Sequence, residues 1–152
     1  MNMKVGEMVP DISLSDQNGE NFSFDQLVGE KSFVVYFYPK DFTPGCTREA
    51  CGFRDSYADF KELEAEVIGI SADSHESHSR FARKYDLPYI FLSDENKKAR
   101  EAFGVKPNLL GLLPGRETFV FDKNGKLIHK FNSMNAGRHM PEALTVLKKN
   151  QN

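Results

Sequence analysis

An apolar run that leads directly toward both cysteines constrains this chain more than any other feature. Residues 33–37 are apolar or aromatic throughout, so they predict a β-strand buried on both faces. Thr43 and Pro44 are the residue types typical of a helix N-cap and of the first helical position. Cys46 then falls in the first helical turn, where free backbone N–H groups and the positive end of the helix dipole favour an anion. The pattern predicts a thiol at Cys46 that ionises more easily than usual.

Apolar residues recur at steps of three and four after Pro44, which indicates a helix that reaches about Leu63 and carries both cysteines. The apolar stripe consists of Cys46, Ala50, Phe53, Tyr57, Phe60 and Leu63. On an ideal helix the Cα atoms of Cys46 and Cys51 would lie roughly 8.6 Å apart, with a rise of about 7.5 Å and a rotation of about 140°. A disulfide requires at most about 7 Å between the two Cα atoms. We therefore expect the helix to unwind locally if the two cysteines react with each other.

The rest of the chain alternates strands with helices and then ends in a hairpin and a helix. Turn sequences at residues 16–19 and 122–125 predict two β-hairpins, the first of them N-terminal. We expect strands at about 8–14, 21–24, 32–38, 66–71, 89–92, 118–121 and 126–131, and further helices at 74–85, 96–103 and 140–149. This order predicts an α/β fold in one domain, residues 1–152. Its central mixed sheet would be flanked by helices, which is the plan of a thioredoxin-like fold.

The charge balance and the cysteine count exclude several classes of function. Lys and Arg number 20 against 22 Asp and Glu, so the net charge is −2, and we expect no nucleic-acid or anionic-membrane partner. The N-terminus lacks a basic segment followed by an apolar one, and no apolar run approaches the length of a membrane span. These features predict a soluble cytoplasmic protein. Two cysteines are too few for the disulfide framework of a small secreted domain, which leaves redox chemistry or metal binding.

The spacing of candidate ligands gives metal binding little support. Zinc sites and thioredoxin-type sites generally use Cys-x-x-Cys, whereas four residues separate Cys46 from Cys51. The four histidines, His75, His78, His129 and His139, have no cysteine-linked metal spacing. His75 and His78 could bind a metal from one helix, but solvated or capping roles are favoured. We expect no metal and no cofactor.

The stretch from Pro39 to Asp55 contains a specific arrangement of residues. It reads Pro39-x-x-x-Thr43-x-x-Cys46 and continues as Thr-x-Glu-Ala-Cys-x-Phe-Arg-Asp. This run resembles the active-site motif of peroxiredoxins, and in its extended form that of the PrxQ, or bacterioferritin comigratory protein, subfamily. Further landmarks along the chain are Gly69-Ile70-Ser71-x-Asp73-Ser74, Lys84-Tyr85-x-Leu87-Pro88, Leu92-Ser93-Asp94 and Arg116-x-Thr118-Phe119.

The resemblance implies a thiol-dependent peroxidase that reduces hydrogen peroxide and organic hydroperoxides, in antioxidant defence and redox homeostasis. Cys46 would be the peroxidatic cysteine, which becomes a sulfenic acid. Cys51 would be the resolving cysteine, and thioredoxin or a similar dithiol would reduce the resulting intramolecular disulfide. Members of this subfamily are often monomers and sometimes dimers, so we expect a monomer or weak homodimer.

Four further residues receive roles from the same resemblance. Pro39 would shield the pocket, Thr43 would hydrogen-bond the peroxide, and Arg116 would stabilise the thiolate. Glu49 would help to orient the arginine. Taken alone, Thr43 would be an ordinary N-cap and Pro39 a strand terminator. Arg116 and Glu49 could each be a solvated surface charge, and only their place in the joint pattern favours an active site.

Two other functions remain open on the sequence. One is a disulfide oxidoreductase or redox sensor that passes oxidation to partner proteins, and the other is a metal-binding module. The sequence also does not decide whether the apolar loop at residues 107–114 packs in the core, lines a pocket or forms a self-association surface.

Overall fold

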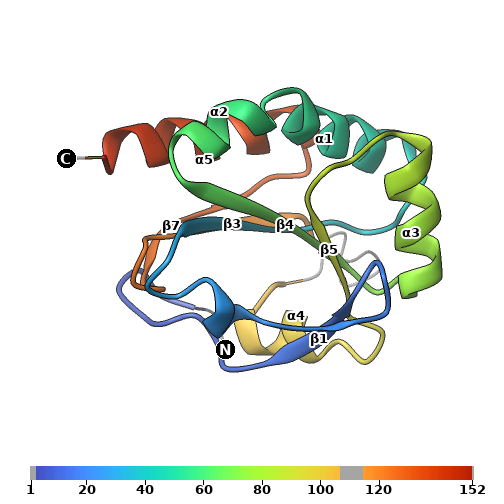
Figure 1. Ribbon diagram of the computed structural model, residues 1–152, viewed down its shortest axis with the longest axis horizontal. Helices are drawn as coiled ribbons and strands as arrows, with labels where there is room; N and C mark the ends of the chain where they lie inside the picture. Colours follow the sequence, from blue (N-terminus) through green and yellow to red (C-terminus); the bar gives the residue numbers. More distant parts are fainter. Residues whose placement is uncertain (1–2, 107–114, 152) are drawn as a thin grey trace.

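The computed structural model describes residues 3–106 and 115–151, so the apolar loop at 107–114 lies outside the described residues. Within them, seven strands form one mixed sheet in the order β2-β1-β5-β4-β3-β6-β7 (Figure 1). The strands are β1 (Ser13–Asp16), β2 (Asn21–Ser23), β3 (Ser32–Phe37), β4 (Ala65–Ser71), β5 (Ile90–Ser93), β6 (Glu117–Phe121) and β7 (Leu127–Asn132). The helices are η1 (Phe24–Gln26), α1 (Pro44–Asp55), α2 (Tyr57–Glu62), α3 (His75–Lys84), α4 (Lys98–Phe103), η2 (Ala136–Arg138) and α5 (His139–Lys149).

β3 lies at the centre of the sheet because its side chains are apolar on both faces. Val34 and Tyr36 belong to a core that α1, α2, α3 and α5 cover, whereas Val35 and Phe37 belong to a second core closed by η1 and α4. β4 pairs with β3 in parallel and β6 pairs with it antiparallel. Figure 1 shows α1, α2 and α5 on one side of the sheet and α4 on the other. The predicted α/β architecture, a mixed sheet with helices on both faces, is confirmed.

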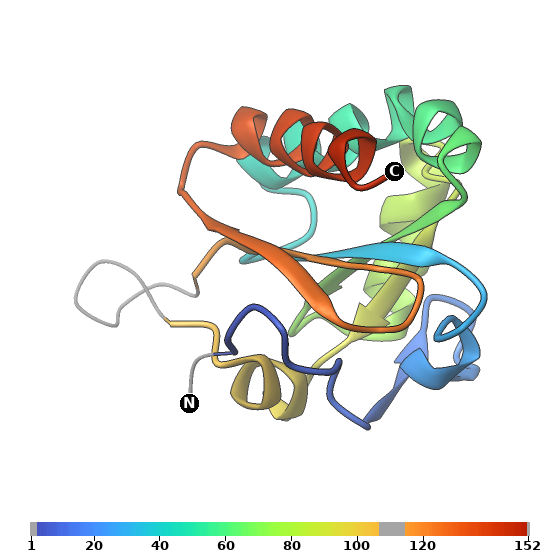
Figure 2. The ribbon, with the colours of Figure 1, turned by 90° about the vertical axis from the view of Figure 1, so that its left-hand side faces the viewer.

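The pairing of β6 with β3 determines which loops meet at one end of these two strands. Phe37, the last residue of β3, is opposite Glu117, the first residue of β6. The chain therefore leaves β3 toward α1 at the same end of the sheet at which Arg116 leads into β6. α5 follows the β6–β7 hairpin and packs beside α1 (Figure 2). This topology brings the start of α1 close to Arg116, although Cys46 and Arg116 are 70 positions apart in the sequence.

Most predicted elements are confirmed, with differences at their ends. The N-terminal hairpin forms, but its first strand begins at Ser13 rather than near Met8. Met8 instead makes an isolated bridge with Lys126, next to the second hairpin. Among the described residues, each helix is too short or too polar to cross a membrane.

The prediction of one continuous helix from Pro44 to Leu63 is wrong. α1 ends at Asp55, and α2 follows after a break at Ser56, whose φ is −105° and ψ 8°. The apolar stripe continues through both helices, so periodicity alone gave no sign of the break. Serine is a weak helix former because its side chain competes for backbone hydrogen bonds, which makes position 56 a suitable helix end.

Candidate active site

The N-terminal end of α1 forms as the sequence predicts, with one difference in its capping. Thr43 is the N-cap residue and has an extended backbone, Pro44 is the first helical residue, and Cys46 the third. The carbonyl oxygen of Thr43 accepts a hydrogen bond from the backbone N–H of Thr47 at 2.8 Å. The Thr43 hydroxyl does not cap the helix and instead donates to the carbonyl oxygen of Lys40 at 2.7 Å. The first backbone N–H groups of α1 are thus not used by the side chain of Thr43.

Three buried side chains meet at this end of α1. Cys46, Glu49 and Arg116 have exposed fractions of 1%, 2% and 5%. Arg116 donates from Nη2 to Cys46 Sγ at 3.4 Å, and from Nη1 to Glu49 Oε1. Cys46 and Glu49 are neighbours on one helix face because three positions correspond to about one turn. The guanidinium also lies against Gly45, where a Cβ would be in ordinary van der Waals contact with Nη2 at 3.4 Å. A cation is therefore held beside a buried thiol sulfur.

Arg116 carries one positive charge between two groups that can each become anionic. Burial alone would lower the pKa of Arg116, but Glu49 and Cys46 outweigh burial and raise it. Burial raises the pKa of Glu49 to about 8, although Arg116 opposes that shift. A carboxyl group with this pKa is largely protonated at neutral pH. The charge of Arg116 is then available to stabilise a thiolate at Cys46.

A buried histidine that the sequence did not assign to the site lies behind Glu49. His139 donates from Nε2 to the carbonyl oxygen of Ser133 at 2.7 Å and accepts at Nδ1 from the Thr118 hydroxyl at 2.7 Å. Its Nδ1 lies 3.8 Å from Glu49 Oε2. Burial lowers the pKa of His139 to about 4, so the ring is neutral at physiological pH. The sequence assigned no role to His139, and the only sequence signal near it was Thr118 in the Arg116-x-Thr118 landmark.

The remaining predicted residues lie around this group without joining it. Cys51 is half-buried farther along α1, and both cysteines are free thiols. Pro39 is half-buried in the loop that connects β3 to α1. The structure thus brings together Cys46, Glu49 and Arg116. It leaves Cys46 and Cys51 as separate thiols on an intact helix.

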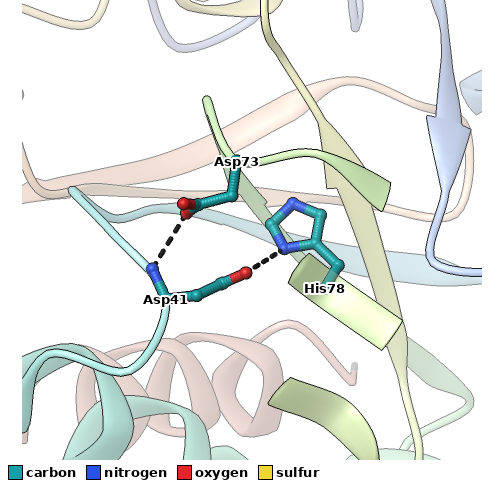
Figure 3. A group of neighbouring side chains, drawn as sticks. All are labelled: Asp41, Asp73 and His78. Atoms are coloured by element: carbon teal, nitrogen blue, oxygen red, sulfur yellow. Dashed lines mark hydrogen bonds and ion pairs between the residues drawn. The ribbon is translucent and has the colours of Figure 1, made fainter. Parts of the chain in front are cut away.

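The connection between β3 and α1 contributes to a second polar cluster. Asp41, Asp73 and His78 each have one ligand-type atom within 4.8 Å of the others (Figure 3). In the described ranges, this is the one group of three or more His, Cys, Asp or Glu side chains with a spacing that suits a metal ion, and it includes neither cysteine. Hydrogen bonds within the protein already occupy these atoms. The cluster does not support a metal site built on the cysteines, and His78 is fully buried rather than solvated.

Comparisons with known proteins agree with the geometry. The chain matches the AhpC/TSA family over residues 5–130. It is 52% identical to the chloroplastic peroxiredoxin Q of Gentiana triflora and 51% identical to that of Sedum lineare, over 145 residues and 94% of this chain in both cases. These matches cover 66% of the first relative, slightly under two thirds of its length, and 77% of the second.

Two solved structures have the same fold over nearly their whole length. Peroxidoxin BcpB from Mycobacterium tuberculosis superposes with a TM-score of 0.89 at 38% identity, covering 98% of this chain and 99% of that one. Peroxiredoxin Q from Xanthomonas campestris superposes with a TM-score of 0.88 at 29% identity, covering 97% and 98%. Fold and site together define a thioredoxin-like peroxiredoxin, and the chain belongs to the AhpC/TSA family. Within that family it is a peroxiredoxin of the Q, or bacterioferritin comigratory protein, type, a class of thiol-dependent peroxidases.

The prediction of a cytoplasmic location is wrong. The relatives from Gentiana triflora, Sedum lineare and Arabidopsis thaliana are named as chloroplastic proteins, and this finding contradicts the prediction. The prediction rested on charge balance and on the lack of long apolar runs. Those features do not distinguish one compartment from another.

Proposed function

We propose that this chain is a single-domain thiol peroxidase in which Cys46 is the peroxidatic cysteine. The observation that carries the proposal is the hydrogen bond of 3.4 Å from Arg116 Nη2 to Cys46 Sγ in the first turn of α1. A thiolate in this place has a permanent cation beside it and the free N–H groups of a helix N-terminus around it. Glu49 orients the arginine through Nη1.

The first step is attack of the Cys46 thiolate on one oxygen of the peroxide. A sulfur–oxygen bond forms, the oxygen–oxygen bond breaks, and sulfur is oxidised to a sulfenic acid. The other oxygen leaves with the electron pair and takes a proton from solvent, which gives water or an alcohol. Negative charge grows on that oxygen in the transition state, so hydrogen-bond donors aimed at it lower the barrier. Arg116, the Cys46 N–H and the Thr43 hydroxyl are the donors we assign to this task.

Thr43 and Pro39 prepare the site for the substrate. In the resting site the Thr43 hydroxyl donates to the Lys40 carbonyl oxygen, and we infer that it turns to the peroxide when substrate binds. Pro39 is half-buried, and we infer that it shields Cys46 from water. Both residues come from the short connection between β3 and α1, so their placement depends on the conformation of that connection.

The second step forms the Cys46–Cys51 disulfide. The Cys51 thiol attacks the sulfenic sulfur, a sulfur–sulfur bond forms, and water leaves. Both cysteines belong to α1, and an intact helix holds them about 8.6 Å apart between Cα atoms, beyond the reach of a disulfide. α1 must therefore unwind between them. Thioredoxin or a similar dithiol then reduces the disulfide and is itself oxidised.

The substrates we propose are hydrogen peroxide and organic hydroperoxides. A structure of the Xanthomonas campestris bacterioferritin comigratory protein is described in terms of alkyl peroxide reduction, which favours the same substrate class here. We further propose a monomer or weak homodimer that acts without a nucleic-acid or membrane partner. The nearly balanced charge of −2 supports this last point.

A mass measurement on the reduced protein tests the proposal. One equivalent of hydrogen peroxide should produce a species that has lost two hydrogen atoms, with a peptide that links Cys46 to Cys51. Thioredoxin with its reductase should restore the original mass and should sustain continuous peroxide consumption. A protein whose thiols stay reduced after one equivalent of peroxide would overturn the proposal.

The same experiment separates the alternative of a redox relay. A disulfide oxidoreductase would react slowly with peroxide but exchange rapidly with a dithiol partner. Membership of the peroxiredoxin class does not favour that alternative.

A further inference from the structure

A buried contact between His78 and Asp41, outside the reacting residues, connects the β3–α1 loop to α3. The His78 Nδ1 and Asp41 Oδ2 atoms are 2.8 Å apart, and the two side chains are 0% and 1% exposed (Figure 3). His78 Nε2 lies 3.0 Å from the carbonyl oxygen of Leu92. Both ring nitrogens of His78 thus lie within hydrogen-bond distance of an oxygen atom, one in the side chain of Asp41 and one in the backbone of Leu92.

Asp41 is also held by three other residues from different parts of the fold. Its Oδ1 accepts from the Tyr38 hydroxyl at 2.5 Å, and its Oδ2 accepts from Ser77 Oγ at 2.8 Å. Its backbone N–H donates to Asp73 Oδ2 at 2.9 Å. Tyr38 follows β3, Asp73 lies between β4 and α3, and Ser77 belongs to α3. The backbone and the side chain of Asp41 are therefore both hydrogen-bonded to residues outside α1.

The residue after Asp41 has a backbone conformation that requires such support. Phe42 has φ of +67°, in the left-handed region that is unfavourable for a large side chain. Its ring packs against Phe81 of α3, with the two centroids 5.2 Å apart, although the residue is 41% exposed. On the other side, the Thr43 hydroxyl closes the turn onto Lys40. The loop reaches α1 in a strained conformation that contacts with α3 maintain.

We propose that Asp41 and His78 are positioning residues for the peroxide reaction, which hold the loop of residues 39–43 in the geometry that receives peroxide. The inference rests on the proposed function, because Pro39 and Thr43 act from this loop and Cys46 follows it. If α1 unwinds in every cycle, an anchor at its N-terminal side also returns Cys46 to Arg116. Neither Asp41 nor His78 contacts the reacting atoms in this scheme.

Three variants test the proposal by the rate at which peroxide oxidises Cys46, followed by stopped flow. His78→Leu removes both ring nitrogens, and with them the contacts to Asp41 and Leu92. His78→Asn is the conservative variant, because the asparagine amide nitrogen takes the approximate place of Nδ1 and still donates to Asp41. Phe24→Ala is the control, since Phe24 is buried in the opposite core and its truncation costs stability without touching the loop.

We expect His78→Leu to oxidise at least about tenfold more slowly than wild type, since a misplacement of about 1 Å can cost a factor of about 100. His78→Asn should recover to within about threefold of wild type, and Phe24→Ala should stay within about twofold. Reduction of the disulfide by thioredoxin should be unchanged in all three. If His78→Leu does not fold, Asp41→Asn provides the same comparison.

The outcomes separate this inference from the proposed function. A His78→Leu rate equal to that of Phe24→Ala would overturn the positioning role while peroxidase activity stands. Equal losses in His78→Leu and His78→Asn would also overturn it, because the donor to Asp41 would then not matter. A wild-type protein whose Cys46 does not react with peroxide would overturn the proposed function itself.

Discussion

The two halves of α1 differ in how firmly the surrounding structure holds them. In the first half, residues 44–50, Cys46, Glu49 and Ala50 are buried, and Arg116 contacts two of them. In the second half, residues 51–55, Cys51 and Gly52 are half-buried and only Phe53 is buried. The first half thus has the contacts that a fixed reaction site needs. The second half has fewer buried residues, and Phe53 anchors it through ring contacts with Tyr36, Phe60 and Tyr89. Under the proposed disulfide step, this is the half that would have to move.

The largest expected effect comes from replacing the cysteine in each half of α1 in turn. Cys46→Ser should abolish peroxide turnover, because a serine hydroxyl is not ionised at neutral pH and cannot replace the thiolate. Cys51→Ser should still react once with peroxide and gain one oxygen atom, but it should lose recycling by thioredoxin. Intact-mass measurements and a thioredoxin-coupled assay check both variants. Full turnover by Cys46→Ser would place the chemistry elsewhere.

The second prediction concerns the arginine that contacts the first half. Arg116→Ala should slow oxidation of Cys46 by a factor of about 100 to 1,000, the usual cost of removing one donor from a charge-stabilising site. Arg116→Lys should recover only part of the rate, because lysine keeps the charge but lacks the planar fork that contacts sulfur and Glu49 together.

Arg54→Ala is the matched control for this prediction. Arg54 lies in the second half of α1, where it donates to the carbonyl oxygen of Tyr85 at 2.7 Å. Its removal should leave the rate of Cys46 oxidation within about twofold of wild type, since its hydrogen bonds go to Asp55 and Tyr85 and not to Cys46, Glu49 or Arg116. Similar losses in the two alanine variants would mean that the contrast between the halves of α1 is not functional.

The first half of α1 was predictable from local sequence, whereas the contacts that hold it were not. Thr43 and Pro44 placed the helix start correctly because capping depends on only a few adjacent residues. The apolar run at 33–37 placed β3 correctly for a similar reason. The contact of Arg116 with Cys46 was predicted only through resemblance to a family, since no local pattern connects positions 70 residues apart.

The polar residues behind the site were missed. The sequence favoured a solvated or capping role for His78 and gave His139 no role, yet both side chains are fully buried. Their burial depends on partners such as Asp41 and Thr118 that the fold supplies from distant segments. The break at Ser56 was missed because the apolar stripe continues through it, so a pattern of burial cannot show where backbone hydrogen bonds are interrupted.

The third prediction uses the pH dependence of stability in the first half. The pKa of Glu49 is raised to about 8 from 4.5, so between these values the folded state binds more protons than the unfolded state. The free energy of unfolding should then fall as pH rises, by at most about 1.4 kcal/mol per pH unit from this group. The pKa of His139 is lowered from 6.5 to about 4 and acts in the opposite direction below pH 6.5. The contribution of Glu49 should therefore be clearest between about pH 6.5 and 8.

Glu49→Gln isolates this contribution because glutamine does not titrate. Urea unfolding from pH 6 to 8.5 should show a flatter profile for the variant than for wild type. His139→Gln provides the comparison, since its difference from wild type should appear only below about pH 6.5. Parallel profiles for Glu49→Gln and wild type would show that burial does not raise the pKa of Glu49.

The smallest expected effect comes from Gly52, in the half of α1 that would unwind in the proposed disulfide step. Alanine fits there because no heavy atom lies within 4 Å of the Cβ position, and it favours a helix over glycine by about 1 kcal/mol. Gly52→Ala should therefore stabilise the reduced protein and slow disulfide formation, by up to about fivefold if α1 is fully unwound in that step. Cys46 oxidation should be unchanged because the first half is not altered.

Thr145→Ala on the exposed face of α5 is the control, since it raises helix propensity in a helix that need not unwind. Stopped-flow traces resolve the two steps. If Gly52→Ala forms the disulfide as fast as Thr145→Ala does, the second half of α1 does not unwind before the sulfurs meet.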